Sequence, residues 1–290
     1  MSWRTVVISS NAKLDYQLGY LVVRSDVTTK IFINEISTLM IESTAVSLTS
    51  CLLCELTKQK VKVIFCDEKR NPSSELLPYY GSHDTSVKIR SQIKWTDDDK
   101  KTVWTAIVGE KIMKQAEFLE ELGRKEASLL QSYVSNLEYG DTSNREGHAA
   151  KVYFNALFGK QFSRSEDNPV NAALNYGYSI FLSAVNREIV SNGYLTQIGI
   201  FHDNIFNPFN LGSDFMEPWR VLVDRKVYEM HPQVFEHDEK MEILNLLNEE
   251  IVIGGKREVI NNALKVYCRS IFDAMGEKDL SLIKFYRNEL

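Results

Sequence analysis

The character of the sequence changes once along its 290 residues, and this change most constrains the fold. Up to about residue 66 the chain consists of short segments rich in β-branched and aromatic residues. Gly, Asn, Asp and Ser separate these segments, which is typical of β-strands joined by turns. From residue 96 onward, apolar residues recur at the three- and four-residue spacing of amphipathic helices. The chain therefore contains two regions of different structural class.

The first region predicts a small β-rich domain over residues 1–76. A helical spacing of apolar residues predicts about one helix in it, near 45–55. A turn-rich stretch follows, and we predict a linker over 77–95. The expected strands of the domain cover 3–8, 19–24, 30–33 and 61–66.

The second region, 96–290, predicts a larger all-α domain, so the expected fold class is α+β with two domains. Thr96 and Asp99 have the spacing of a capping box at a helix start. Asn168-Pro169 marks a later helix start, and Gly159 and Gly193 mark stops. A chain of this length is long enough to form two hydrophobic cores.

Composition limits the possible partners and the compartment. The formal net charge is −5, so any nucleic-acid binding must use a local basic face rather than the whole surface. The four cysteines form no pattern of two paired half-sites, and free thiols indicate a reducing compartment. No apolar run approaches the roughly 20 residues of a membrane span, and no signal-peptide pattern is present. We therefore expect a cytoplasmic location and no membrane partner.

A first candidate site residue is Glu146. Ser143-Asn-Arg-Glu146 has the form of a capping box, and apolar residues at helical spacing follow as far as Gly159. In one interpretation Glu146 caps its own helix. In the other, Gly147 and the two alanines after it leave room beside Glu146, so that a nucleic-acid backbone can approach closely.

The helix that begins at Asn168-Pro169 carries a polar stripe. Asn171, Asn175 and Tyr178 share one face of it. If this face is buried, water or neighbouring helices must satisfy these groups. If it lines a cleft, the amides and the phenol are suitable contacts for phosphates and bases.

A second group of candidates starts at His202, where a short extended segment is expected to enter a loop. Ser213 is the expected N-cap of a helix whose first turn holds Asp214 and Glu217 on one face. Two like charges this close repel each other unless a cation joins them. Pro218 is expected to kink this helix.

Arg220 stands three residues after Glu217, so it forms either an ion pair with Glu217 or a clamp on a phosphate. Two carboxylates and one imidazole suit a divalent metal, with positions left open for water and phosphate. We therefore expect Glu146, His202 and Glu217 to hold one Mn²⁺ or Mg²⁺ beside a nucleic-acid phosphate.

Three motifs together resemble the CRISPR-associated spacer-acquisition integrases, the Cas1 family, over nearly the whole chain. They are Glu146-Gly-x-Ala-Ala-x-x-Tyr-Phe, Asn171-x-x-x-Asn-Tyr-Gly-Tyr, and His202 followed by Asp214-x-Met-Glu-Pro-x-Arg. The third is long and fairly specific, whereas the first alone would be weak. The residues within these motifs look most like those of the type II-A branch of Firmicute-like bacteria.

The resemblance implies that Glu146, His202 and Glu217 are the catalytic metal ligands and that Asp214 assists beside the metal. It also implies a metal-dependent strand transfer, in which a 3′-hydroxyl of prespacer DNA attacks a phosphodiester at the border of a CRISPR repeat. The implied partners are a prespacer duplex with 3′ overhangs, a homodimer built on the N-terminal domains, and a Cas2 dimer bridging two such homodimers. Other type II-A adaptation proteins are further candidate partners.

Two alternatives stay open at this point. One is a metal-dependent, structure-selective nuclease that cuts DNA or RNA without joining strands. The other is a non-catalytic DNA-binding scaffold in which the carboxylates only cap helices and form ion pairs. Analysis of the products separates the integrase, which joins strands, from the nuclease, which shortens them. Metal dependence separates both enzymes from the scaffold.

Overall fold

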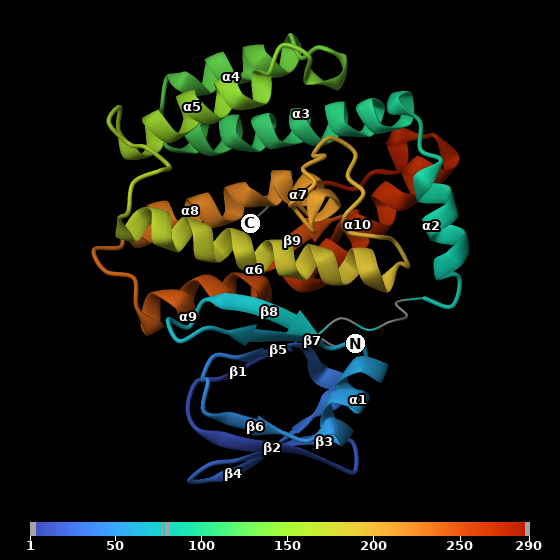
Figure 1. Cartoon of the computed structure of the whole chain (residues 1–290). Helices are drawn as coiled ribbons and strands as arrows, with labels where there is room; N and C mark the ends of the chain where they lie inside the picture. Colours follow the sequence, from blue (N-terminus) through green and yellow to red (C-terminus); the bar gives the residue numbers. More distant parts are fainter. Residues whose placement is uncertain (1–3, 77, 79–81, 288–290) are drawn as a thin grey trace.

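A computed structural model describes residues 4–76, 78 and 82–287 of the chain. A β-rich N-terminal region and a mostly helical C-terminal region stack on each other, with the sheets at the bottom of Figure 1 and the helices above them. This confirms the expected α+β architecture. None of the helices in these residues is long and apolar enough to cross a membrane.

The N-terminal region contains two four-stranded sheets, ordered β1-β5-β7-β8 and β4-β3-β2-β6. The predicted strands correspond to β1, β3, β4 and β7, whereas β2, β5, β6 and β8 were missed. The one expected helix exists but starts later, because residues 46–48 pair in parallel with β2 instead. The elements are β1 Arg4–Ile8, β2 Ala12–Gln17, β3 Tyr20–Arg24, β4 Thr28–Phe32, β5 Ile36–Ile41, β6 Val46–Leu48, α1 Ser50–Lys58, β7 Lys62–Cys66 and β8 Pro72–Leu76.

The two regions share a packed junction. Met40, Ile64 and Cys66, from one sheet of the N-terminal region, belong to the hydrophobic core of the helical region. Within the predicted linker, Thr85–Ile93 form helix α2, and the side chain of its buried Gln92 donates to the carbonyl oxygens of Leu195 and Ile198. The stretch between the regions is therefore partly a docked helix, and the domain boundaries themselves stay predictions.

Helices dominate the remainder of the chain, and Thr96 and Asp99 form the expected capping box on α3. A small three-stranded sheet, β10-β9-β11, corrects the all-α expectation. Its hairpin turns at Gly254 and Gly255, which both have positive φ angles, as tight hairpin turns require. The elements are α3 Asp97–Glu121, α4 Glu126–Ser135, α5 Arg145–Phe158, α6 Pro169–Ser191, α7 Asn210–Met216, α8 Arg220–Met230, α9 His237–Asn245, β9 Glu250–Ile253, β10 Lys256–Val259, α10 Ile260–Glu277 and β11 Tyr286–Arg287.

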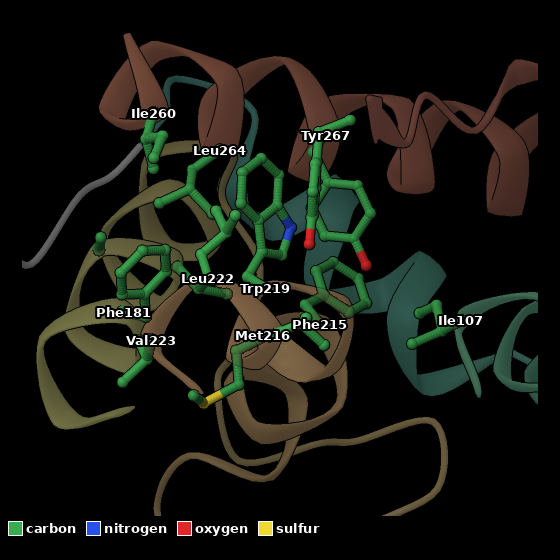
Figure 2. Packing of buried hydrophobic residues seen from close by; sticks show 14 of the residues in the cluster. Ile107, Phe181, Phe215, Met216, Trp219, Leu222, Val223, Ile260, Leu264 and Tyr267 are labelled. Atoms are coloured by element: carbon green, nitrogen blue, oxygen red, sulfur yellow. The ribbon is translucent and has the colours of Figure 1, made fainter. Parts of the chain in front are cut away.

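Aromatic side chains hold together the helices that carry the site. Trp219, just before α8, packs against Tyr267 of α10 with ring centroids 5.5 Å apart, and Phe215 of α7 lies beside them in Figure 2. Helix α6 approaches α8 closely at Gly177, where an added Cβ would collide with Val223. The absence of a side chain at Gly177 therefore lets α8 pack closely against α6.

Candidate active site

Glu146 lies in the first turn of α5, but it does not cap the helix. The N-cap is Asn144, whose side chain accepts a hydrogen bond from the amide of Gly147 at 3.3 Å. The carboxylate of Asp141 accepts from the amides of Arg145 and Glu146, at 2.6 and 3.1 Å. The expected capping box from Ser143 is therefore wrong. Because other residues satisfy these amides, the carboxylate of Glu146 is free to reach α3.

Lys111 of α3 joins the two predicted carboxylate ligands. Its ammonium donates to Oε1 of Glu146 and to Oε2 of Glu217, each at 2.5 Å. The side chains of Lys111 and Glu217 are buried, at 7% and 5% exposure, whereas Glu146 retains 27%. Burial alone would lower the pKa of Lys111, but the charges of Glu217 and Glu146 outweigh it and raise the pKa. One cation thus links carboxylates from two distant parts of the chain.

Lys111 was not among the residues predicted from the sequence, although a signal was present. It follows the fully buried Ile107 by four residues and precedes the fully buried Ile112 by one. A Lys on the buried side of an amphipathic helix almost always has a charged partner. That pattern alone would have identified Lys111 as half of a buried ion pair.

Glu217 sits where α7 gives way to α8. A short 3₁₀ turn over Glu217–Trp219 separates the two helices, and Pro218 in this turn confirms the expected kink. Nε of Arg220 lies 3.0 Å from Oε1 of Glu217. Burial would raise the pKa of Glu217, but the charges of Arg220 and Lys111 dominate and lower it to about 2. Glu217 is therefore ionised in spite of its burial.

Asp214 organises the segment that carries His202. Its fully buried carboxylate accepts hydrogen bonds from the amides of Ile200, Phe201 and His202, at 2.7, 3.1 and 3.0 Å. The same carboxylate accepts from Nδ1 of His202 at 2.6 Å, and this hydrogen bond raises the pKa of His202. With Nδ1 engaged, Nε2 is the atom left to bind a ligand. Asp214 thus holds the His202 ring in position through this hydrogen bond.

Two local expectations for this segment are wrong. Residues 199–202 form a bend rather than a strand end, because their amides turn inward onto Asp214. Ser213 lies inside α7 rather than at its N-cap, which is Phe209. The helix starts early because the side chain of Asn210 donates to the carbonyl oxygens of Gln197 and Asn204 and so ties the preceding loop back.

The structure brings the three predicted ligands to one open pocket of about 700 Å³. Asp214 does not line it, since its carboxylate lies behind His202. Within residues 4–76, 78 and 82–287, no three His, Cys, Asp or Glu side chains are grouped closely enough to hold a metal as they stand. The pocket is lined by Lys111, Gln115, Glu146, Ala150, Phe154, Arg164, Tyr178, His202, Glu217, Arg220 and Asp224.

Two guanidinium groups give the pocket a cationic side. Arg220 lies 4.6 Å and Arg164 5.5 Å from the centroid of the Tyr178 ring. The hydroxyl of Tyr178 donates to the fully buried carboxylate of Asp224, and burial raises the pKa of Asp224 to about 6. Arg220 is therefore both the partner of Glu217 and a pocket residue. Arg164, in the loop before α6, was missed because a lone Arg in a polar loop carries no sequence signal.

The polar stripe on α6 divides between two places. Tyr178 lines the pocket, whereas Asn171 and Asn175 line a separate depression near the junction of the two regions. The side-chain oxygens of both Asn residues accept from the guanidinium of Arg164, at 2.6 Å in the case of Asn175. These amides hold Arg164 in place, and their direct contact with nucleic acid stays a prediction.

Comparison with known proteins identifies the family. A family model described as CRISPR associated protein Cas1 matches residues 5–245. This chain belongs to the Cas1 family. The resemblance inferred from the three motifs is thereby confirmed.

Individual Cas1 relatives agree with this assignment. A CRISPR-associated endonuclease Cas1 from Neisseria meningitidis is 36% identical over 235 residues, covering 80% of this chain and 77% of the relative. A casposase solved bound to its integration product has the same fold, with a TM-score of 0.76, 16% identity, and coverage of 100% of this chain and 92% of its own. A chain of a solved Cas6-RT-Cas1–Cas2 complex matches with a TM-score of 0.73 and 17% identity, covering 99% of this chain and 36% of its own.

Proposed function

We propose that this Cas1 protein is the integrase of CRISPR adaptation, which joins the 3′-hydroxyl of prespacer DNA to the repeat of a CRISPR array. The observation that carries the proposal is the meeting of Glu146, His202 and Glu217, from three separate elements, in one pocket with a cationic side. The casposase relative, solved with its integration product, supports strand joining as the reaction of this fold.

The donor set fits a divalent cation of the Mn²⁺ or Mg²⁺ type. Glu146 and Glu217 already share one cationic group, the ammonium of Lys111, at 2.5 Å from each. His202 lines the same pocket and keeps Nε2 free, because Asp214 engages Nδ1. Carboxylate oxygens and a neutral imidazole are the donors that such metals accept. Glu146, Glu217 and His202 are therefore the residues that would hold such a metal.

When bound, this metal supplies Lewis-acid stabilisation of the charge that develops on the phosphoryl oxygens. The chain's own residues do the remaining work. Arg220 and Arg164 would hold the phosphate from one side, and the hydrogen bond that Nδ1 of His202 donates to Asp214 keeps the imidazole ring in a single orientation. Phosphoryl transfer depends mainly on such positioning and on neutralised charge, so no covalent enzyme intermediate is required.

The proposal extends to the assembly. The matching chain in the Cas6-RT-Cas1–Cas2 complex supports Cas2 as a partner. We propose that two homodimers, built on the N-terminal regions, flank a Cas2 dimer and share one prespacer duplex with 3′ overhangs. A chain with a net charge of −5 fits such an assembly, because the basic track for the DNA is then shared among subunits.

A strand-transfer assay tests the proposal. Labelled duplex with 3′ overhangs is incubated with a supercoiled plasmid carrying a repeat, in the presence of Cas2 and either Mn²⁺ or EDTA. We expect metal-dependent joined product with the wild type and none with Glu146→Ala. His148→Ala is the matched control, since His148 is exposed on the same helix and does not line the pocket.

The products distinguish the alternatives. Shortened strands without joined product would indicate a nuclease, which is the activity in the name of the Neisseria relative. DNA binding without any metal-dependent product would indicate a scaffold. Equal activity of Glu146→Ala and wild type would remove Glu146 from the site.

A further inference from the structure

Two large apolar side chains stand in solvent beside the candidate active site. Ile205 is 88% and Phe206 is 87% exposed, in the loop 203–209 between His202 and α7. Burial of such a side chain stabilises a protein, and in this loop two adjacent side chains lack that stabilisation in the isolated chain. Adjacent exposed apolar residues next to a functional pocket suggest a surface that a ligand covers.

The loop is held in a defined shape. The side-chain oxygen of Asn204 accepts from the amide of Phe206 at 2.9 Å. The side chain of Asn210 donates to the carbonyl oxygen of Asn204 at 3.0 Å and accepts from the amide of Asn204 at 3.3 Å. Phe206 is therefore presented by an ordered turn, and a ligand that binds it pays little to order the backbone.

The start of the loop is fixed to the wall of the pocket. The ring of Phe201 stacks on Trp104 of α3, with centroids 4.2 Å apart and planes 4° apart, and the same Trp meets the His202 ring edge-on at 5.9 Å. Figure 1 shows the loop before α7 lying beside α3. The position of the loop is therefore set by the same contacts that position His202.

The distance along the chain limits what can cover Phe206. It follows His202 by four residues, so its Cα lies within about 14 Å of that of His202. A stacked DNA strand rises about 3.4 Å per nucleotide. Phe206 is therefore within reach of a base about four nucleotides or fewer from the phosphate in the pocket.

We propose that Ile205 and Phe206 form a stacking platform for an unpaired nucleobase of the DNA strand whose phosphate enters the pocket. The inference rests on the proposed function, since it takes DNA as the ligand. The aromatic face of Phe206 offers a surface that every base can stack on, so the platform is indifferent to sequence.

The size of the surface favours a base over a protein. A stable protein interface covers about 800 Å² on each partner. An exposed Phe contributes on the order of 200 Å² and Ile no more than that, so the pair reaches only about half of this area. A patch of this size suits one stacked base better than a protein surface.

Binding in EDTA tests the platform without the chemistry. The probe is a short duplex whose single-stranded 3′ overhang carries 2-aminopurine at successive positions, with a blunt duplex for comparison. The variants are Phe206→Ala and Phe206→Trp, and the control is Val87→Ala, which removes a 65%-exposed apolar side chain from α2. Stacking on the wild type quenches the fluorophore at one or two overhang positions.

We expect Phe206→Ala to lose this quenching and to bind the overhang duplex roughly 5- to 150-fold more weakly, the range of one stacked base. Its affinity for blunt duplex and the salt dependence of binding stay at wild-type values, because no phosphate contact changes. Phe206→Trp keeps the quenching, and Val87→Ala behaves as wild type.

Three results would overturn the platform. The first is wild-type quenching by Phe206→Ala with an unchanged oligomer mass. The second is an equal loss of quenching in Val87→Ala. The third is wild-type quenching by Phe206→Ala together with a changed oligomer mass, which would make the loop a protein interface. Failure of the proposed function looks different: the overhang is bound and quenched as expected, but the wild type yields no joined product with Mn²⁺.

Discussion

Replacing Lys111 by Met tests the electrostatic reasoning at the site most directly. The change keeps most of the length of the side chain and removes the cation between Glu146 and Glu217. Removing one partner of a buried ion pair typically costs 3–5 kcal/mol. Here Glu217 keeps Arg220 at 3.0 Å and Glu146 keeps 27% exposure, so the lower end, about 3 kcal/mol, is expected. For a chain of this size that corresponds to a fall of the melting temperature by roughly 6–12 °C in EDTA.

Metal should reverse the loss, since a divalent cation supplies the charge that Lys111 supplied. At about 100 times its dissociation constant, a metal adds roughly 2.7 kcal/mol to the stability of the protein that binds it. Thermal unfolding in EDTA and in millimolar Mn²⁺ measures both effects. Mn²⁺ should raise the melting temperature of Lys111→Met more than that of the wild type, whose own ammonium competes with the metal.

Lys114→Met is the matched control on the same helix. Lys114 is also buried and contacts Glu117 at 2.7 Å and Glu110 at 3.6 Å, but it does not line the pocket. It should lose stability in EDTA without selective recovery in Mn²⁺. The reasoning would be refuted if Lys111→Met melted like the wild type in EDTA, or if Mn²⁺ restored Lys114→Met equally well.

Two further substitutions separate positioning from phosphate contact. Asp214→Asn weakens the hydrogen bond that orients His202, so strand joining should fall about 10- to 100-fold, and the apparent affinity for Mn²⁺ should fall with it while DNA affinity stays. An Asp214→Asn protein with wild-type Mn²⁺ affinity would contradict this role. Arg164→Gln removes one cation from the pocket, so DNA binding should weaken uniformly across sequences and the slope of log K against log salt should fall by about 0.7–0.9. A salt titration of binding checks this, and an unchanged slope would leave Arg164 as a purely structural partner of Asn171 and Asn175.

Local patterns in the sequence predicted much of the fold. The change from short β-branched segments to helical spacing identified the two regions, because the periodicity of buried residues follows directly from strand and helix geometry. The capping box at Thr96 and the kink at Pro218 were equally readable, since both depend on neighbouring residues only. Strands such as Val46–Leu48 were missed because their pairing with a distant strand overrides local preference.

The residues of the candidate site were named from the sequence, but their arrangement was not. Chemistry and motif order pointed to Glu146, His202 and Glu217. Only the structure showed the contacts of Lys111 with the two carboxylates, the position of Arg164 over Tyr178 and the hydrogen bond between His202 and Asp214. Each joins side chains that are remote in the chain or hidden in a loop. The spacing of residues on α3 indicates that Lys111 is buried and paired, but it does not identify the partners. The sequence by itself determined the chemical types of the candidate ligands for a metal and a phosphate. The packing of α3 against α5 and against the break between α7 and α8 decided that they meet, because only tertiary contacts bring buried charges within reach of one another.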